Sequence, residues 1–168
     1  LAVRWALGLG LAGMGIAFTM TPPQAQQIQP DTWAGIAGAH TVGAADGGTG
    51  LPFFGWSTIA GDLRVSHFLG LHALQVLPAF ALIVSVAIAS QYARLAIITG
   101  LGMSYGLFIA FTYVQALMGQ SIVHVSTIAG LVLALIVGLL VSALSQRVRS
   151  NSHKRRLSLP EMKKPKKL

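Results

Sequence analysis

Four histidines lie in or beside the apolar part of the sequence, and they are the residues best suited to hold a metal or a cofactor. They are His40, His67, His72 and His124. A neutral imidazole can ligate haem iron, the magnesium of a chlorin, copper or zinc. Gln75 follows His72 by three residues, and residues three apart share one face of a helix. We therefore consider His72, Gln75 and His124 as a candidate cofactor set, and His67, His124 and His40 as a weaker candidate metal set.

The same histidines also have structural explanations. His67 and His124 each fall in the first turn of a predicted helix, where water reaches the side chain, and His72 could bond a loop carbonyl or Gln75. His67 and His72 are five residues apart, about 140° around a helix, so they cannot share a face. We expect a structural role and no cofactor by default. A bound haem, chlorin, quinone or metal ion remains the alternative.

Catalytic groups are scarce in this chain. It has no cysteine and four acidic residues, and none of the acidic residues lies inside a predicted span. A carboxylate pathway for protons or cations through a membrane is therefore not expected. No nucleophile can be combined with a base and an orienting acid, so hydrolase chemistry has no positive support, and a non-enzymatic role is favoured with the question left open.

The elements that position these residues are predicted from hydropathy. The sequence is 54% hydrophobic and 10% charged. Stretches of about 20 apolar residues match the thickness of a bilayer core. We predict spans at residues 2–20, 66–90, 94–118 and 121–146, joined by short turns except for a loop over residues 21–65. The expected fold is an all-α membrane protein: a four-transmembrane-helix bundle with an ordered outer loop between the first two helices.

The basic residues predict the orientation. The formal net charge is +8, and nine of the twelve basic residues lie in the tail, residues 147–168. Cationic segments beside spans stay in the cytoplasm and contact anionic lipid. With Arg4 and Arg94 on the same side, the loop is expected outside, periplasmic or extracellular, and the tail is expected in the cytoplasm. We expect the tail to be disordered, membrane lipids to be partners, and no nucleic acid to bind.

The loop carries four residues to which we assign structural roles. Asp62 and Arg64 flank Leu63 just before a helix and are expected to form a local ion pair. Asp46 opens an Asp-Gly-Gly sequence typical of a tight turn. Trp56 is expected at the headgroup level, where aromatic residues gather.

Small residues predict close helix packing. GLGLAG, residues 8–13, fits G-x-G-x-x-G, but it lies inside an apolar span instead of a βαβ unit, so a dinucleotide site is rejected. Small residues four apart allow helices to approach closely. The candidate packing residues are Gly8, Gly10 and Ala12 in the first span and Gly102 and Gly106 in the third. Their presence favours other integral membrane proteins as partners.

Residues 38–78 carry the run GAHTVGAADGGTGLPFFGWSTIAGDLRVSHFLGLHALQVLP. This run resembles the signature of an uncharacterised family of bacterial multi-pass inner-membrane proteins, which reads GAHTVG, DGG-GLP, GWST, GDLRV and HF-GLHALQ in this order. The resemblance implies a helical inner-membrane protein. It also implies that six residues form one unit with the loop: His40, Asp62, Arg64, His67, His72 and Gln75. It supplies no activity. It also implies that this chain corresponds to the C-terminal half of longer proteins, so an N-terminal half is expected to be missing.

The leading functional hypothesis is a non-catalytic integral membrane subunit that packs against other membrane proteins in a larger complex. The alternative is a redox or cofactor-binding membrane protein with a haem, chlorin, quinone or metal held by the histidines of the outer side. A transporter would need a broken helix at mid-span. Pro78 is the one such break in the sequence, so we rank a transporter third.

Overall fold

The computed structural model describes residues 1–23, 27–29, 31 and 37–157. Its elements are α1 (Ala2–Ala17), η1 (Phe18–Met20), β1 (Thr41–Val42), β2 (Gly61–Asp62), α2 (Leu63–Ala87), α3 (Gln91–Leu117) and α4 (Val125–Leu157). Within the described residues, four helices are long and apolar enough to cross a membrane, which indicates a multi-pass membrane protein. The all-helical prediction is therefore confirmed, with a two-stranded sheet of two residues per strand as the addition.

Local capping explains where the helices begin. α2 begins at Leu63, three residues before the predicted start, because the Asp62 carboxylate accepts a hydrogen bond from the Arg64 amide. α3 likewise begins at Gln91, where the Ser90 hydroxyl accepts from the Ala93 amide. α2 continues through Pro78 without ending.

The C-terminal tail differs from its prediction. α4 continues to Leu157, so residues 147–157 are helical where disorder was expected. This stretch holds no glycine or proline and is rich in arginine and lysine, which favour helix. The predicted disorder of residues 158–168 lies outside the described residues.

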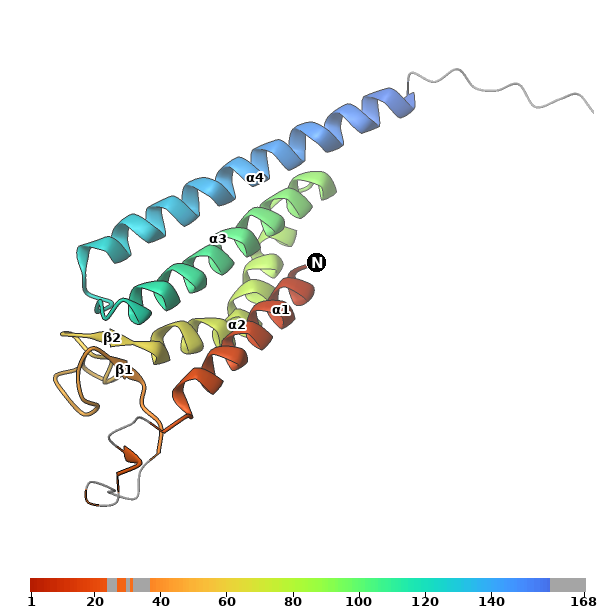
Figure 1. The fold of residues 1–168 in the computed structure, drawn as a ribbon. Coiled ribbons are helices and arrows are strands. Elements are labelled where there is room, and N and C mark those ends of the chain that lie inside the picture. Colours follow the sequence, from red (N-terminus) through yellow and green to blue (C-terminus); the bar gives the residue numbers. More distant parts are fainter. Residues whose placement is uncertain (24–26, 30, 32–36, 158–168) are drawn as a thin grey trace, which may run out of the picture.

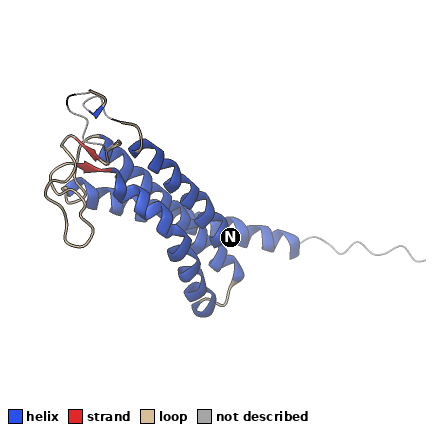
Figure 2. Cartoon of the chain, turned by 90° about the horizontal axis from the view of Figure 1, so that it is seen from below, coloured by secondary structure: helices blue, strands red, loops and turns tan. Residues whose placement is uncertain are grey.

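The helices are arranged as an open group. α1 packs along α2, α2 packs on α3, and α4 packs chiefly on α3, on the side away from α1 (Figure 1). The strands and the described loop residues 37–62 lie at one end of the helices, which we call the loop end (Figure 2). The opposite end, beyond which α4 extends, is the tail end. The core is small and lies between α1, α2 and α3, around Ala6, Ala73 and Leu77.

Glycines set the distances between the helices. A Cβ atom on Gly70 of α2 would lie 2.5 Å from the Cα atom of Gly13 in α1. A Cβ atom on Gly138 of α4 would lie 2.6 Å from the Gly100 carbonyl oxygen of α3. Both contacts join backbone to backbone, which only glycine permits. These pairs were not among the predicted packing residues.

The predicted packing residues divide into two groups. A Cβ atom on Gly10 would meet Leu74 at 3.3 Å, one on Gly102 would meet Trp5, and one on Gly106 would meet Leu9. These three glycines therefore lie in helix contacts. Gly8 has no described atom within 4 Å of its Cβ position, and Ala12 is exposed. The Gly8–Ala12 side of α1 is open.

The close approach at Gly70 gives a direct test. Gly70→Ala forces a methyl group against the backbone of α1, so the variant should lose about 1–3 kcal/mol of unfolding free energy, the usual cost of overpacking. The matched control is Gly8→Ala, whose new methyl group meets no described atom. Thermal unfolding in detergent should show Gly70→Ala melting lower and Gly8→Ala unchanged or higher. Equal melting of the two variants would contradict this packing.

Candidate functional site

The cap, residues 37–62, folds over the loop end of the helices and carries the two carboxylates of Asp46 and Asp62. β1 and β2 pair antiparallel, with Thr41 opposite Asp62 and Val42 opposite Gly61. Gly61 packs against α3, where a Cβ atom would lie 2.7 Å from the Ala116 carbonyl carbon. β2 runs directly into α2, so the strand pair fixes the cap against two helices.

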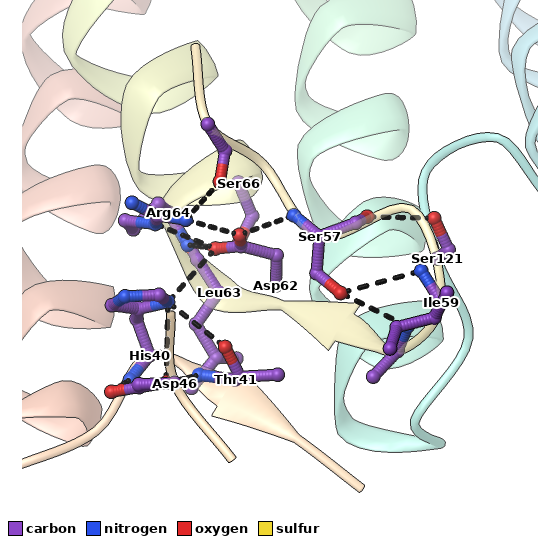
Figure 3. Close-up of polar contacts among 12 residues, drawn as sticks. His40, Thr41, Asp46, Ser57, Ile59, Asp62, Leu63, Arg64, Ser66 and Ser121 are labelled. Carbon is purple, nitrogen blue, oxygen red and sulfur yellow. Dashed lines mark hydrogen bonds and ion pairs between the residues drawn. The ribbon is translucent and has the colours of Figure 1, made fainter. Parts of the chain in front are cut away.

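The Asp62 carboxylate lies at the centre of the cap (Figure 3). Asp62 is 1% exposed and accepts hydrogen bonds from the backbone amides of Ser57 at 2.9 Å and Arg64 at 3.0 Å. The Arg64 guanidinium donates to the same carboxylate from Nε at 3.0 Å and from Nη2 at 2.7 Å. The predicted Asp62–Arg64 ion pair is therefore present, and the buried charge is fully hydrogen-bonded.

A second carboxylate, Asp46, holds the start of β1. It accepts from the backbone amides of His40 at 3.2 Å and Thr41 at 2.8 Å. The His40 ring lies between the two carboxylates, with Nδ1 3.4 Å from Asp46 Oδ1 and 3.7 Å from Asp62 Oδ1 (Figure 3). The predicted turn at Asp46 thus serves to anchor the histidine segment.

Both carboxylates are stabilised in their ionised form. Burial would raise the pKa of Asp62, but hydrogen bonds from the Arg64 side chain and from the Ser57 and Arg64 amides hold it below its ordinary value. Burial also acts to raise the pKa of Asp46, and hydrogen bonds from Thr41 and His40 outweigh it, so that pKa is lowered as well. The cap therefore keeps two negative charges close to one guanidinium.

The cluster is also tied to the turn between α3 and α4. The Ser121 hydroxyl donates to the Ser57 carbonyl at 2.8 Å, and the Gln115 amide nitrogen donates to the Ser121 carbonyl at 2.8 Å. Ser57, Gln115 and Ser121 are all buried. These links are not predictable from the sequence, because serines 64 residues apart carry no local signal of contact.

A small cavity of about 90 Å³ lies beside the cluster. Its polar lining comes from His40, Thr41, Ser57 and Arg64, and glycines supply much of the rest. This volume is close to that of about three water molecules at ~30 Å³ each. The cavity can hold ordered water, and it is too small for a cofactor ring.

The two histidines of α2 each bond a backbone carbonyl. His67 Nδ1 lies 2.7 Å from the Gly13 carbonyl oxygen of α1, and His72 Nδ1 lies 2.9 Å from the Phe68 carbonyl oxygen of its own helix. A carbonyl only accepts, so Nδ1 carries the hydrogen in both rings. His67 therefore joins α1 to α2 beside Gly70, and His72 is fixed on its own helix.

Gln75 and His124 lie where the cofactor hypothesis did not place them. Gln75 is exposed, and its amide nitrogen, oriented as a donor, is 3.2 Å from the Leu71 and His72 carbonyl oxygens. His124 is also exposed, and its Nδ1 accepts from the Ser126 amide at 3.3 Å at the start of α4. His72 and Gln75 share a face as predicted, but that face points away from the core, which Ala73 occupies.

The candidate sets are therefore not assembled. Among the described residues, no hydrogen bond or ring contact joins His72 or Gln75 to His124. His40, His67 and His124 also have separate partners. Nowhere in the described part of the chain do three or more His, Cys, Asp or Glu side chains meet in a group that could hold a metal ion.

Trp56 belongs to an aromatic stack that links the cap to α2. Its ring centroid is 4.5 Å from that of Phe54 and 5.3 Å from that of Phe68 on α2. Phe68 in turn stacks on the His72 ring at 3.7 Å. The stack covers one side of His72 and places the aromatic part of the loop beside the first turns of α2.

Comparisons with protein-family models, with curated protein sequences and with solved structures find no match to this chain. What the chain does is therefore inferred from its own residues and their contacts.

The role of the Asp62 carboxylate can be measured directly. Asp62→Asn removes the charge that Arg64 pairs with, so cap opening should become easier by about 2–3 kcal/mol, less than for a fully buried pair because Arg64 is partly exposed. Hydrogen exchange of the backbone amides of residues 57–64 reports this opening. Asp46→Asn is the control and should cost less, because the Asp46 side chain is 34% exposed. An equal effect of the two substitutions would show that Asp62 is not central.

Proposed function

We propose that this chain is a non-catalytic integral membrane subunit that packs against other membrane proteins. The loop, residues 21–65, lies on the outer side of a bacterial cytoplasmic membrane, and the basic tail lies inside. The bacterial membrane follows from the resemblance of residues 38–78 to inner-membrane proteins. The orientation is supported by Arg4, Arg94 and the tail, which all belong to the tail end of the helices.

The exposed surface of the helices supports the membrane location. Large apolar side chains such as Leu82, Val86 and Leu139 are between 70% and 89% exposed. Soluble monomers rarely expose contiguous apolar surface of this kind. Lipid or other apolar helices would cover it.

The main support for a protein partner is the position of Gln75, which is exposed and lies deep in α2. It lies twelve residues into α2, about 18 Å along the helix at 1.5 Å per residue, and its side chain is exposed. Lipid chains offer no hydrogen-bonding groups at this depth, and polar residues of spans generally face protein. A neighbouring helix that bonds the Gln75 amide accounts for its position. The open Gly8–Ala12 side of α1 offers a second surface for close helix contact.

The polar groups of the cap support a non-catalytic role. Asp62 and Arg64 bond each other, Asp46 bonds the β1 backbone, and His40 lies between the carboxylates. These contacts give the charged side chains of the cluster a structural use.

His72 favours one second candidate, a membrane protein that binds a tetrapyrrole or a metal. Because Nδ1 donates to the Phe68 carbonyl, the neutral ring presents the lone pair of Nε2, which has no partner among the described residues. Metal-ligating histidines commonly hold the other nitrogen in this way. The lack of a second ligand near His72 in the described chain keeps this candidate below the first.

One purification tests both candidates. A photo-crosslinking residue at Gln75 or Ala12 should link the chain to the same membrane protein in intact cells, while one at Val132, exposed on α4, should not. The gently solubilised sample should show no Soret band, no chlorin absorption and no stoichiometric copper or zinc. Crosslinks to lipid alone at Gln75 and Ala12 would contradict the partner. A His72-dependent absorption band would establish the second candidate.

A further inference from the structure

The backbone at Phe53 is unlike that of any other residue outside glycine in the described chain. Phe53 has a φ of +67°, and it is the one non-glycine residue with a positive φ among those described. The Phe54 amide donates to the Pro52 carbonyl at 2.9 Å, so Phe53 is the central residue of a three-residue γ-turn. This form of turn is rare and strained, the more so for a bulky side chain. The Phe53 side chain is nevertheless fully exposed.

The strained turn is held by the segment around it. Residues 49–58 form a hairpin that we call the aromatic finger, with Phe53 at its tip. The Leu51 amide donates to the Trp56 carbonyl at 2.8 Å, and the Gly55 amide donates to the Leu51 carbonyl at 2.8 Å. Arg64 Nη2 donates to the Gly55 carbonyl at 2.7 Å. A conformation held by this many bonds is a fixed feature of the fold, and such strain occurs mainly at functional positions.

Contacts with α2 place the finger beside the outward face of that helix. Arg64 and Phe68 of α2 contact the finger at Gly55 and at Phe54 and Trp56. Arg64, Phe68 and Gln75 lie within about 40° of one another around the helix axis. Because Gln75 is exposed, this stripe points away from the core. The finger therefore lies outside the helix group, at the level of the first turns of α2.

We propose that the aromatic finger dips into the interfacial layer of the membrane on the loop side, with Phe53 as the side chain that enters lipid. This inference rests on the proposed membrane insertion and adds a second point of contact between the cap and the bilayer. The tip residues are uncharged, and the nearest cation, Arg64, is already paired with Asp62. Aromatic side chains next to a span are most stable at the headgroup level.

The occupant is lipid because the finger presents exposed, uncharged aromatic side chains beside a span. Phe54 and Phe68 meet edge to face at 5.8 Å, and the outward side of α2 continues below them with Leu82 and Val86, both strongly exposed. Gln75 lies between Phe68 and Leu82 on this side of α2, so the lipid contact proposed for the finger is limited to the first turns of the helix, and a partner at Gln75 would lie deeper.

Depth-dependent fluorescence quenching tests the inference on the full chain in phosphatidylcholine vesicles. Trp5, Trp33 and Trp56 are changed to Phe, and single reporters are introduced as Phe53→Trp, Leu82→Trp and Ala45→Trp. Lipids brominated near the headgroup should quench the reporter at position 53 severalfold more than the one at position 45. Lipids brominated near the chain ends should quench the reporter at position 82 best.

The controls separate the two proposals. Quenching at position 82 without quenching at position 53 would overturn the finger while leaving membrane insertion intact, and would free the finger for a protein partner. Absence of quenching at position 82 would overturn both. If the tryptophan variant does not fold, a nitroxide on Phe53→Cys replaces it, because the chain has no other cysteine. That label should be more accessible to oxygen than to a water-soluble nickel complex, and the reverse order would overturn the finger.

Discussion

One buried carboxylate, that of Asp62, joins the parts of the loop end to one another. It caps α2, pairs with the Arg64 guanidinium and accepts a hydrogen bond from the Ser57 amide. The Arg64 guanidinium also donates a hydrogen bond to the Gly55 carbonyl of the finger. The Ser57 carbonyl accepts a hydrogen bond from the Ser121 hydroxyl in the turn before α4. A charge with no water around it must be paired and hydrogen-bonded to be tolerated. The finger and the start of α2 are therefore fixed together by one carboxylate, which accepts from the Ser57 and Arg64 amides, while the Asp62 backbone pairs with Thr41 in the sheet.

The histidines of the helices each make a different contact and do not converge on one site, which favours a non-catalytic role. His67 links two helices, and His124 caps the start of α4. His72 lies on the outside of α2 with a phenylalanine ring against it. A redox or metal centre needs such ligands to converge, whereas a subunit that presents surfaces to neighbours does not. For the exposed Gln75 side chain, the described residues offer only carbonyls of its own helix.

Much of the fold could be predicted from the sequence, since the lengths of the apolar stretches and the positions of the basic residues can be read directly from it. The Asp62–Arg64 pair was also predictable, because its partners are two residues apart. Other features depend on tertiary contacts. Gly13 and Gly70 meet only once α1 and α2 are aligned, and whether the Gln75 face points inward depends on which side of α2 the partner helices occupy. The strain at Phe53 follows from hydrogen bonds across the hairpin, which no single residue type indicates.

The proposed orientation is tested most directly by finding on which side of the membrane the loop end and the tail end lie. Because the chain has no cysteine, single variants at Ala45→Cys in the cap and Ser152→Cys near the end of α4 can be labelled with a membrane-impermeant maleimide. With the cap outside and the tail inside, the cap label should react from outside intact cells and the tail label should react only after permeabilisation. Labelling of both positions from outside, or of the tail alone, would contradict it.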